Sequence, residues 1–179
     1  HRRRQRQMCI RDRIYNDPRR FGFFKILKNK KDYLKFFTRI GPEAISKDFN
    51  KKYLDKILKN RTKNIKNLLL DQKLVSGLGN IYVNEILFQA KINPFRKSFL
   101  INLDENKRIV KYSKIILKKA IHFGGSSIRD FKGITGKSGN FQSEFKVYDR
   151  AKKRCSRNNC FGQISRKIIS NRSTFICSV

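Results

Sequence analysis

The sequence predicts an α+β protein in which a helical region lies between two shorter regions with strand character. Apolar residues recur at helical spacing in four stretches, at 51–59, 65–70, 80–90 and 104–123. Aromatic and β-branched residues instead predict strands at 21–27, 144–150, 164–169 and 173–177. Gly124 and Gly125 are expected to end the longest helix, whose buried stripe would carry Ile109, Ile116, Ala120 and Phe123.

The composition predicts a polyanionic partner. Among 179 residues, 44 Lys and Arg face 13 Asp and Glu, which gives a formal net charge of +31. Such an excess is costly in self-repulsion and is typical of nucleic-acid-binding proteins. A membrane surface is the alternative, but the chain has no long uncharged apolar run and no signal peptide. With 39% hydrophobic residues it is also too apolar for a disordered basic tail.

The first 13 residues differ from the remainder of the chain. Residues 1–13 contain six arginines and no lysine, whereas lysine predominates elsewhere. A nucleic-acid-binding arm would have this composition. Residues 8–13, however, look like translated read-through of a sequencing adapter, so we interpret residues 1–13 as a non-native leader. Native sequence is then expected to begin near Ile14.

The rest of the chain is organised around residues 71–85, which read DQKLVSGLGNIYVNE. Gly77 and Gly79 allow backbone turns that a residue with a Cβ resists. Asn80 is the expected N-cap of the helix that follows. The start of that helix has unpaired N–H groups and a positive dipole end, which suit a phosphate. An ordinary helix-turn-helix corner has the same spacing, so the spacing alone leaves both interpretations open.

The residues of this stretch resemble the helix-two-turn-helix signature of the formamidopyrimidine-DNA glycosylase family, which excises oxidised purines from DNA. Further similarities are the Arg19-Arg20-Phe21 run, the loop 124–131 and the cysteine hairpin at the C-terminus. The resemblance implies that 14–43 are the last strands of an N-terminal β-sandwich domain. It also implies that 44–131 form a helix-two-turn-helix DNA-binding domain and 132–179 a lid loop and a truncated zinc-finger hairpin.

The resemblance implies DNA contacts for several basic residues. Arg19 would reach the base left unpaired when the lesion flips out, Phe21 would fill the vacated stack, and Arg20 would hold a phosphate. A basic hairpin in any cationic protein would look similar. Further DNA-binding candidates are Arg61, Lys66, Gly79, Asn80 and Arg172. For Arg61, a solvated charge at a helix end is an equally good interpretation.

The resemblance assigns the lesion itself to a loop and a hairpin tip. In the family, a loop like 124–131 folds over the extruded purine, although a Gly-Gly-Ser-Ser sequence alone is weak evidence. The composition of 131–145 suits a lid. Arg172 is expected at the hairpin tip, where it would contact a phosphate near the lesion and take part in elimination. The candidate lesion-binding residues are Gly125, Ser126, Ser127, Arg129 and Tyr148.

Three of the four cysteines lie close together near the C-terminus, at positions 155, 160 and 177. Without a secretion signal, they are better metal thiolates than disulfide partners. The resemblance implies one structural Zn²⁺ on the hairpin. Two departures from the family pattern are visible. The first cysteine pair is spaced by four residues, which still suits zinc, and the sequence ends at Val179 before the expected fourth cysteine. Weak or incomplete zinc binding is therefore expected.

The family's nucleophile is the amine of an N-terminal proline, which forms a Schiff base with the sugar and so supports base excision and strand cleavage. No Pro-Glu start is present here. We therefore expect a C-terminal fragment that binds damaged duplex DNA without cutting it, from a bacterial, cytoplasmic, nucleoid-associated and monomeric repair enzyme. The alternatives are a ribosomal-protein-like binding module and a paralogous glycosylase for oxidised pyrimidines. The sequence leaves the preferred lesion open.

Overall fold

The structure, a computed structural model, describes residues 22–126 and 139–179, and the chain divides after Phe37 into two compact units. Several predicted features lie outside the described residues. These are the leader at 1–13 and the candidates Arg19, Arg20, Phe21, Ser127 and Arg129. Within the described residues, no helix is long and apolar enough to cross a membrane.

The described part of the first unit contains one helix, α1 (Lys30–Phe37). The side chain of Asn29 accepts a hydrogen bond from the backbone N–H of Asp32 at 2.9 Å at the start of this helix. The predicted strand at 21–27 is wrong for its described part, because residues 22–28 have no regular structure. A strand requires a partner for its backbone groups, and no described segment pairs with this one. Within residues 22–43, the part of the predicted 14–43 that the structure describes, no strand of a β-sandwich is formed.

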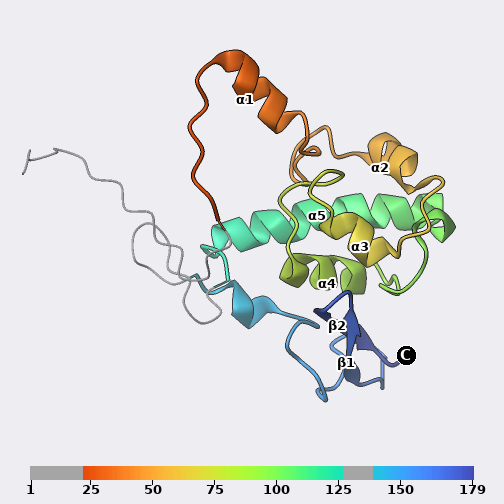
Figure 1. Ribbon diagram of the computed structural model, residues 1–179. Coiled ribbons are helices and arrows are strands. Elements are labelled where there is room, and N and C mark those ends of the chain that lie inside the picture. The colour runs from red at the N-terminus through yellow and green to blue at the C-terminus, as the bar shows by residue number, and fades with distance from the viewer. Residues whose placement is uncertain (1–21, 127–138) are drawn as a thin grey trace, which may run out of the picture. The chain divides into compact units, whose positions relative to one another are not determined.

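The second unit holds the remaining elements (Figure 1). Its helices confirm the four predicted stretches to within one or two residues. They are α2 (Lys51–Leu58), α3 (Ile65–Leu70), α4 (Asn80–Gln89) and α5 (Leu103–His122). The short 3-10 helix η1 (Ser98–Leu100) lies between α4 and α5, and η2 (Phe141–Glu144) lies between α5 and the hairpin. Asparagine side chains cap three of these helices, at positions 50, 64 and 102, because the amide oxygen accepts the backbone N–H groups left unpaired in a first turn.

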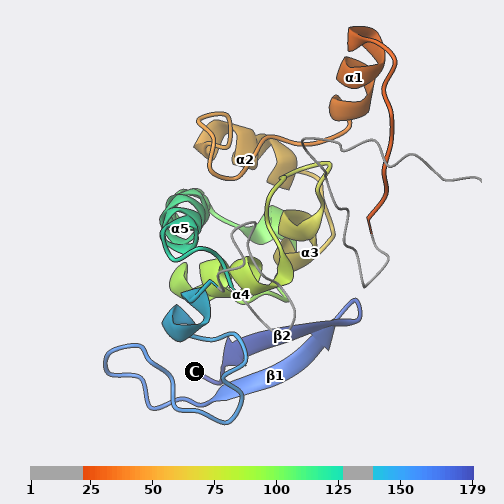
Figure 2. The same ribbon diagram turned by 90° about the vertical axis from the view of Figure 1, so that its left-hand side faces the viewer.

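The helices enclose one main hydrophobic core. Its largest fully buried apolar side chains are Phe49, Leu54, Ile65, Leu68, Leu69, Ile86, Leu87 and Ile109. Ile109, Ile116 and Ala120 lie on the buried side of α5, as predicted, whereas Phe123 is the C-cap residue and is only partly buried. In both ribbon views α4 lies between α5 and the C-terminal hairpin (Figures 1 and 2). Helix α4 therefore packs against both the helical core and the hairpin.

The hairpin pairs β1 (Ile164–Ile169) with β2 (Arg172–Cys177) in antiparallel register, with Ile164 opposite Cys177 and Ile169 opposite Arg172. Ser170 and Asn171 form the two-residue turn, and both have positive φ angles. Positive φ at both central residues matches the twist of the flanking strands. The sequence therefore predicted this hairpin correctly, including the place of Arg172 at its tip.

The strand predicted at 144–150 is wrong. Residues 141–144 form η2, and turns follow. The backbone N–H groups of Lys146, Val147 and Tyr148 donate to the carboxylate of Glu85 on α4, at 2.8–3.2 Å. A strand needs these donors for a neighbouring strand. The buried carboxylate satisfies them instead and fixes this segment against α4.

Candidate nucleic-acid interface and metal centre

The turn between α3 and α4 is shaped by glycines and by one glutamine. Gly77 has a φ of 82°, a conformation that side chains with a Cβ resist. The side chain of Gln72 accepts the N–H of Gly77 at 3.0 Å and donates to the carbonyl of Leu78 at 2.9 Å. Leu78 itself is buried in the core. The turn is therefore held by the Gln72 side chain and by the burial of Leu78, and its backbone leads directly into α4.

The first turn of α4 has no side-chain cap. The N-cap is Gly79, and no side chain accepts a hydrogen bond there. The prediction that Asn80 caps this helix is wrong, because Asn80 is the first helical residue and its amide donates to the carbonyl of Ser173 at 3.0 Å. The bare N–H groups and the dipole of α4 leave its N-terminus suited to an anion.

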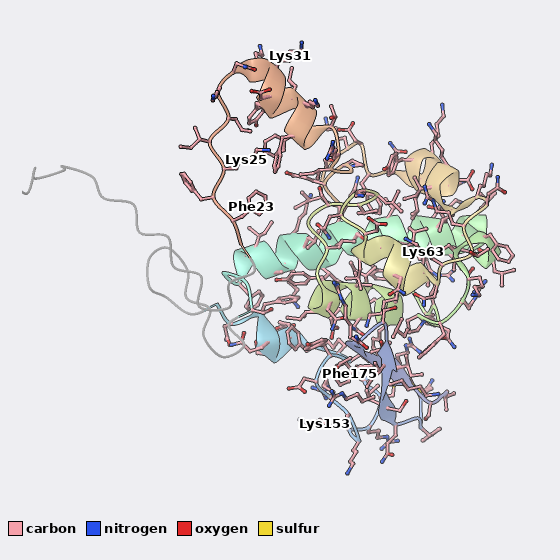
Figure 3. All side chains as sticks on the ribbon, in the orientation of Figure 1. Phe23, Lys25, Lys31, Lys63, Lys153 and Phe175 are labelled. Atoms are coloured by element: carbon pink, nitrogen blue, oxygen red, sulfur yellow. The ribbon has the colours of Figure 1, made fainter. Side chains whose placement is uncertain are left out.

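The hairpin tip is attached to α3 and α4 beside this helix start. Lys66 donates to the carbonyl of Ser173 at 2.8 Å and to the hydroxyl of Thr174 at 2.7 Å. The Asn84 side chain accepts the N–H of Phe175 at 2.9 Å. Phe175 is labelled on β2 in Figure 3. The exposed Arg172 thus lies one residue from the carbonyl that Asn80 and Lys66 share.

Among the predicted DNA-binding residues, the structure places Asn80 and Arg172 on the two chain segments that meet at Ser173, with Gly79 beside Asn80. Arg61 lies half-buried in the connection between α2 and α3. Lys66 is fully buried, and its ammonium is bonded to protein acceptors. A direct phosphate contact by Lys66 therefore does not fit this structure. Burial and the neighbouring charge of Arg172 lower the pKa of Lys66 to about 8.

The two ends of the candidate lesion loop are bonded to each other. The N–H of Phe141 donates to the carbonyl of Gly125 at 3.0 Å, and Ser126 forms an isolated bridge with Asn140. Gly139 is required there, because a Cβ at this position would lie 2.2 Å from the Gly125 oxygen. The hydroxyl of Ser126 is buried and has no hydrogen-bond partner within the described residues.

The Tyr148 ring, a predicted lesion contact, is half-buried in an aromatic row that runs from the loop base to the hairpin. It packs against Phe145 at 5.6 Å and Phe175 at 5.0 Å between ring centroids. The anchor of this segment, Glu85, is a functional candidate that the sequence pattern did not single out. Its signal was present as an acidic residue among the mostly apolar residues 81–88 of α4, of which 83–88 are all buried.

The three cysteines of the hairpin region come together. The sulfurs of Cys155, Cys160 and Cys177 all lie within 4.8 Å of one another, and those of Cys160 and Cys177 are 3.6 Å apart. Tetrahedral Zn²⁺ with Zn–S bonds of about 2.3 Å places its sulfurs about 3.8 Å apart. The donor set therefore fits zinc. Within the described ranges, no histidine or carboxylate joins this cluster.

The surroundings of the thiols differ. The backbone N–H of Gly162 lowers the pKa of Cys160, whereas burial raises the pKa of Cys177 to about 11. Gly162 also allows close approach, because a Cβ there would lie 2.7 Å from the Cys177 sulfur. A metal ion would favour the thiolate form of each residue, since zinc binds the deprotonated sulfur.

Two helices joined by the glycine turn form a helix-two-turn-helix motif, and the thiol-bearing hairpin is docked on its second helix. Residues 40–132 match the model of the formamidopyrimidine-DNA glycosylase H2TH domain, which is more than half of the chain. The chain belongs to the formamidopyrimidine-DNA glycosylase family.

Relatives and solved structures extend this similarity beyond the matched domain. The formamidopyrimidine-DNA glycosylase of Roseobacter denitrificans is 44% identical over 165 residues, which cover 92% of this chain and 58% of that protein. The Zymomonas mobilis enzyme is 44% identical over 163 residues, or 90% and 59%. The crystal structure of MutM (Fpg) from Thermus thermophilus matches with a TM-score of 0.80 at 34% identity, over 90% of this chain and 61% of that one.

The Lactococcus lactis Fpg mutant G226P, solved in complex with DNA containing Fapy-dG, has a TM-score of 0.75 at 37% identity, over 83% of this chain and 54% of that one. The chain therefore spans just over half of the length of the proteins that it matches.

Proposed function

We propose that this chain supplies the DNA-binding part of a DNA repair glycosylase and AP lyase that releases oxidised purines and then cleaves the strand. The observation that carries the proposal is the meeting of the uncapped start of α4 with the Arg172 end of the hairpin at the Ser173 carbonyl. Family membership supports it. So do the DNA complexes of the Lactococcus lactis protein, whose ligands include Fapy-dG and abasic-site DNA.

In the proposed complex, backbone N–H groups at the start of α4 and the guanidinium of Arg172 bind phosphates of the damaged strand. A guanidinium offers a planar pair of donors that matches phosphate oxygens, and a helix N-terminus adds a fixed positive potential. Arg61 adds a peripheral contact. Arg19, Arg20 and Phe21 act at the base pair left by the lesion, and the loop that begins at Gly125 covers the flipped base. The net charge of +31 supports this assignment.

The amine nucleophile of base excision is not among the residues assigned here. Arg172 is the chain's own contribution to chemistry, since a guanidinium near the lesion phosphate can stabilise charge that develops during elimination. The chain alone is therefore expected to bind damaged duplexes and to leave them uncut.

The experiment compares purified chain with three duplexes of one sequence, which carry 8-oxoguanine, an abasic-site analogue or no lesion. Tighter binding to the damaged duplexes is expected, with a log–log salt slope of about −0.9 for each phosphate neutralised. Equal affinity for all three duplexes and for structured RNA would overturn the proposal in favour of a ribosomal-protein-like module. Borohydride trapping on abasic DNA provides the second readout, and a trapped complex would contradict the assignment of binding alone.

We also propose that Cys155, Cys160 and Cys177 hold one structural Zn²⁺ that stabilises the hairpin. A two-stranded hairpin is marginal in water, and metal binding supplies folding free energy. Chelator competition on the chain, and on a variant with one cysteine appended after Val179, tests the ligand set. Tighter zinc binding by the extended chain is expected, because structural zinc sites have four protein ligands. Equal affinity would show that the fourth ligand comes from elsewhere in the chain or that the site does not bind zinc.

A further inference from the structure

Three side chains from two helices converge on one backbone carbonyl at the hairpin tip. The carbonyl of Ser173 accepts from the Lys66 ammonium at 2.8 Å, from the Asn80 amide at 3.0 Å and from the Asn84 amide at 3.4 Å. A carbonyl oxygen has two lone pairs, so this acceptor is fully used. Ser173 directly follows Arg172, and the three donors therefore act on the backbone that carries the guanidinium.

Lys66 is an unusual donor at this position because it is fully buried. An ammonium removed from water is costly unless protein groups replace its hydration. Here Ser173 and Thr174 supply two short hydrogen bonds, and Thr174 is itself buried and donates to the carbonyl of Arg172 at 3.2 Å. An apolar side chain would fill the same space at a lower desolvation cost. The presence of a lysine here is thus better explained by its hydrogen bonds to Ser173 and Thr174 than by a contribution to core stability.

The hairpin turn is attached to the same helix by a second contact. The Asn67 amide on α3 donates to the Ser170 hydroxyl at 2.8 Å. Lys66 and Asn67, which are adjacent on α3, therefore hold the residues on either side of Asn171 and Arg172. A free two-stranded hairpin would let its tip move independently of the helices. These contacts make the tip part of the helical domain.

We propose that Lys66 is a positioning residue for Arg172: it fixes the first residues of β2 to α3, so that the guanidinium is presented to DNA at a set distance from the start of α4. This rests on the proposed DNA contact of Arg172. Lys66 itself touches no DNA in this assignment. Its effect on affinity should therefore pass through Arg172.

A double-mutant cycle on binding to abasic duplex tests this coupling. Arg172→Ala is expected to weaken binding about tenfold, as for one charge-assisted phosphate contact. Lys66→Met is expected to weaken it about fivefold in the native background and less than about twofold in the Arg172→Ala background, because residues that act as a unit are not additive. Lys107→Met, an exposed lysine change on α5, is the charge-matched control and should be additive with Arg172→Ala.

The outcomes separate the two proposals. If both single changes weaken binding but their effects add, the positioning role of Lys66 is wrong and the DNA contact of Arg172 stands. If Arg172→Ala has no effect while the chain still prefers damaged DNA, the contact assigned to Arg172 is wrong and the positioning role with it. If the native chain has no such preference, the proposed function itself fails.

Hydrogen exchange without DNA supplies a measurement that does not depend on affinity. Thr174→Val keeps the buried volume and removes one acceptor of Lys66. It should raise exchange at the Phe175 N–H, which is bonded to Asn84, while leaving α5 unchanged; Lys66→Met should raise it further. Unchanged exchange at Phe175 in both variants would overturn the proposal.

Discussion

The helical core and the C-terminal hairpin are held by different kinds of interaction. The helices bury a continuous set of leucine, isoleucine and valine side chains. A second, smaller apolar cluster joins the hairpin to its neighbours and consists of Phe88 of α4, Val147, Cys155, Ile164 and Phe175. Buried polar side chains attach the hairpin to the helices, chiefly Lys66 and Asn84, and Glu85 holds residues 146–148 on α4 in the same way.

This difference distinguishes the interactions that mainly stabilise the domain from those that fix the position of the hairpin. Apolar burial is non-directional and stabilises many arrangements of roughly the right volume. The hydrogen bonds that Lys66 donates and that Asn84 and Glu85 accept require particular distances and angles. They hold the hairpin on α3 and α4, and residues 146–148 on α4. We infer that the helical core provides most of the stability of the domain, and that the polar attachments add to it while setting the geometry of the site.

Among the changes that test this difference, Glu85→Gln is expected to lower the free energy of unfolding the most. The carboxylate accepts three backbone N–H groups, and Val147 beside it is fully buried. Replacing a charged acceptor by a neutral one, with an amide turned toward a donor, should lower the free energy of unfolding by about 3 kcal/mol. Denaturant unfolding measures this change. Glu43→Gln, on an exposed side chain, is the control and should change it by less than about 0.5 kcal/mol. Equal effects would mean that the Glu85 anchor contributes nothing specific.

A smaller effect is expected on the pH dependence of the free energy of unfolding, to which Lys66 contributes. Its pKa is about 8 in the folded protein and 10.5 ordinarily. Between these values the unfolded chain binds more protons, so the free energy of unfolding rises with pH and falls as the pH is lowered toward 8. Relative to Lys66→Met, the native chain should gain at most about 1.4 kcal/mol per pH unit in this window. Chemical denaturation of both chains at pH 7, 8 and 9.5 measures the difference. A constant difference across the three values would contradict burial of the ammonium.

The smallest effect is expected at the thiol cluster. In Gly162→Ala, the new methyl group would lie 2.7 Å from the Cys177 sulfur, so that side chain must shift. Overpacking of this kind costs about 1 kcal/mol or somewhat more, which should weaken zinc binding roughly tenfold. Chelator competition gives the affinity, with the exposed change Ser156→Ala beside Cys155 as the control. Unchanged zinc affinity in Gly162→Ala would place the metal away from Cys177.

The sequence predicted the elements whose cause is local. Apolar spacing located α2 to α5, and the strands expected at 164–169 and 173–177, together with the family resemblance, located the hairpin. The errors lie at residues whose conformation is set by tertiary contacts. Residues 144–150 alternate like a strand, but the Glu85 carboxylate takes their N–H groups. Asn80 suits a cap by composition, but its amide is drawn to Ser173.

The candidate site was predicted in part for the same reason. The glycine turn, Arg172 and the three cysteines are visible as motifs. The burial of Lys66 and its bond to a residue 107 positions later are not, because no local pattern encodes a contact of that range. The role proposed for Lys66 therefore required the structure.

The central claim is that the start of α4 and the hairpin tip bind DNA as one surface. The most direct measurement is hydrogen exchange of the chain with and without an abasic duplex, followed at 78–82 and at 170–175. Both segments should gain protection together, with the same dependence on DNA concentration. Protection confined to one segment, or appearing in the two at different DNA concentrations, would contradict a single composite surface.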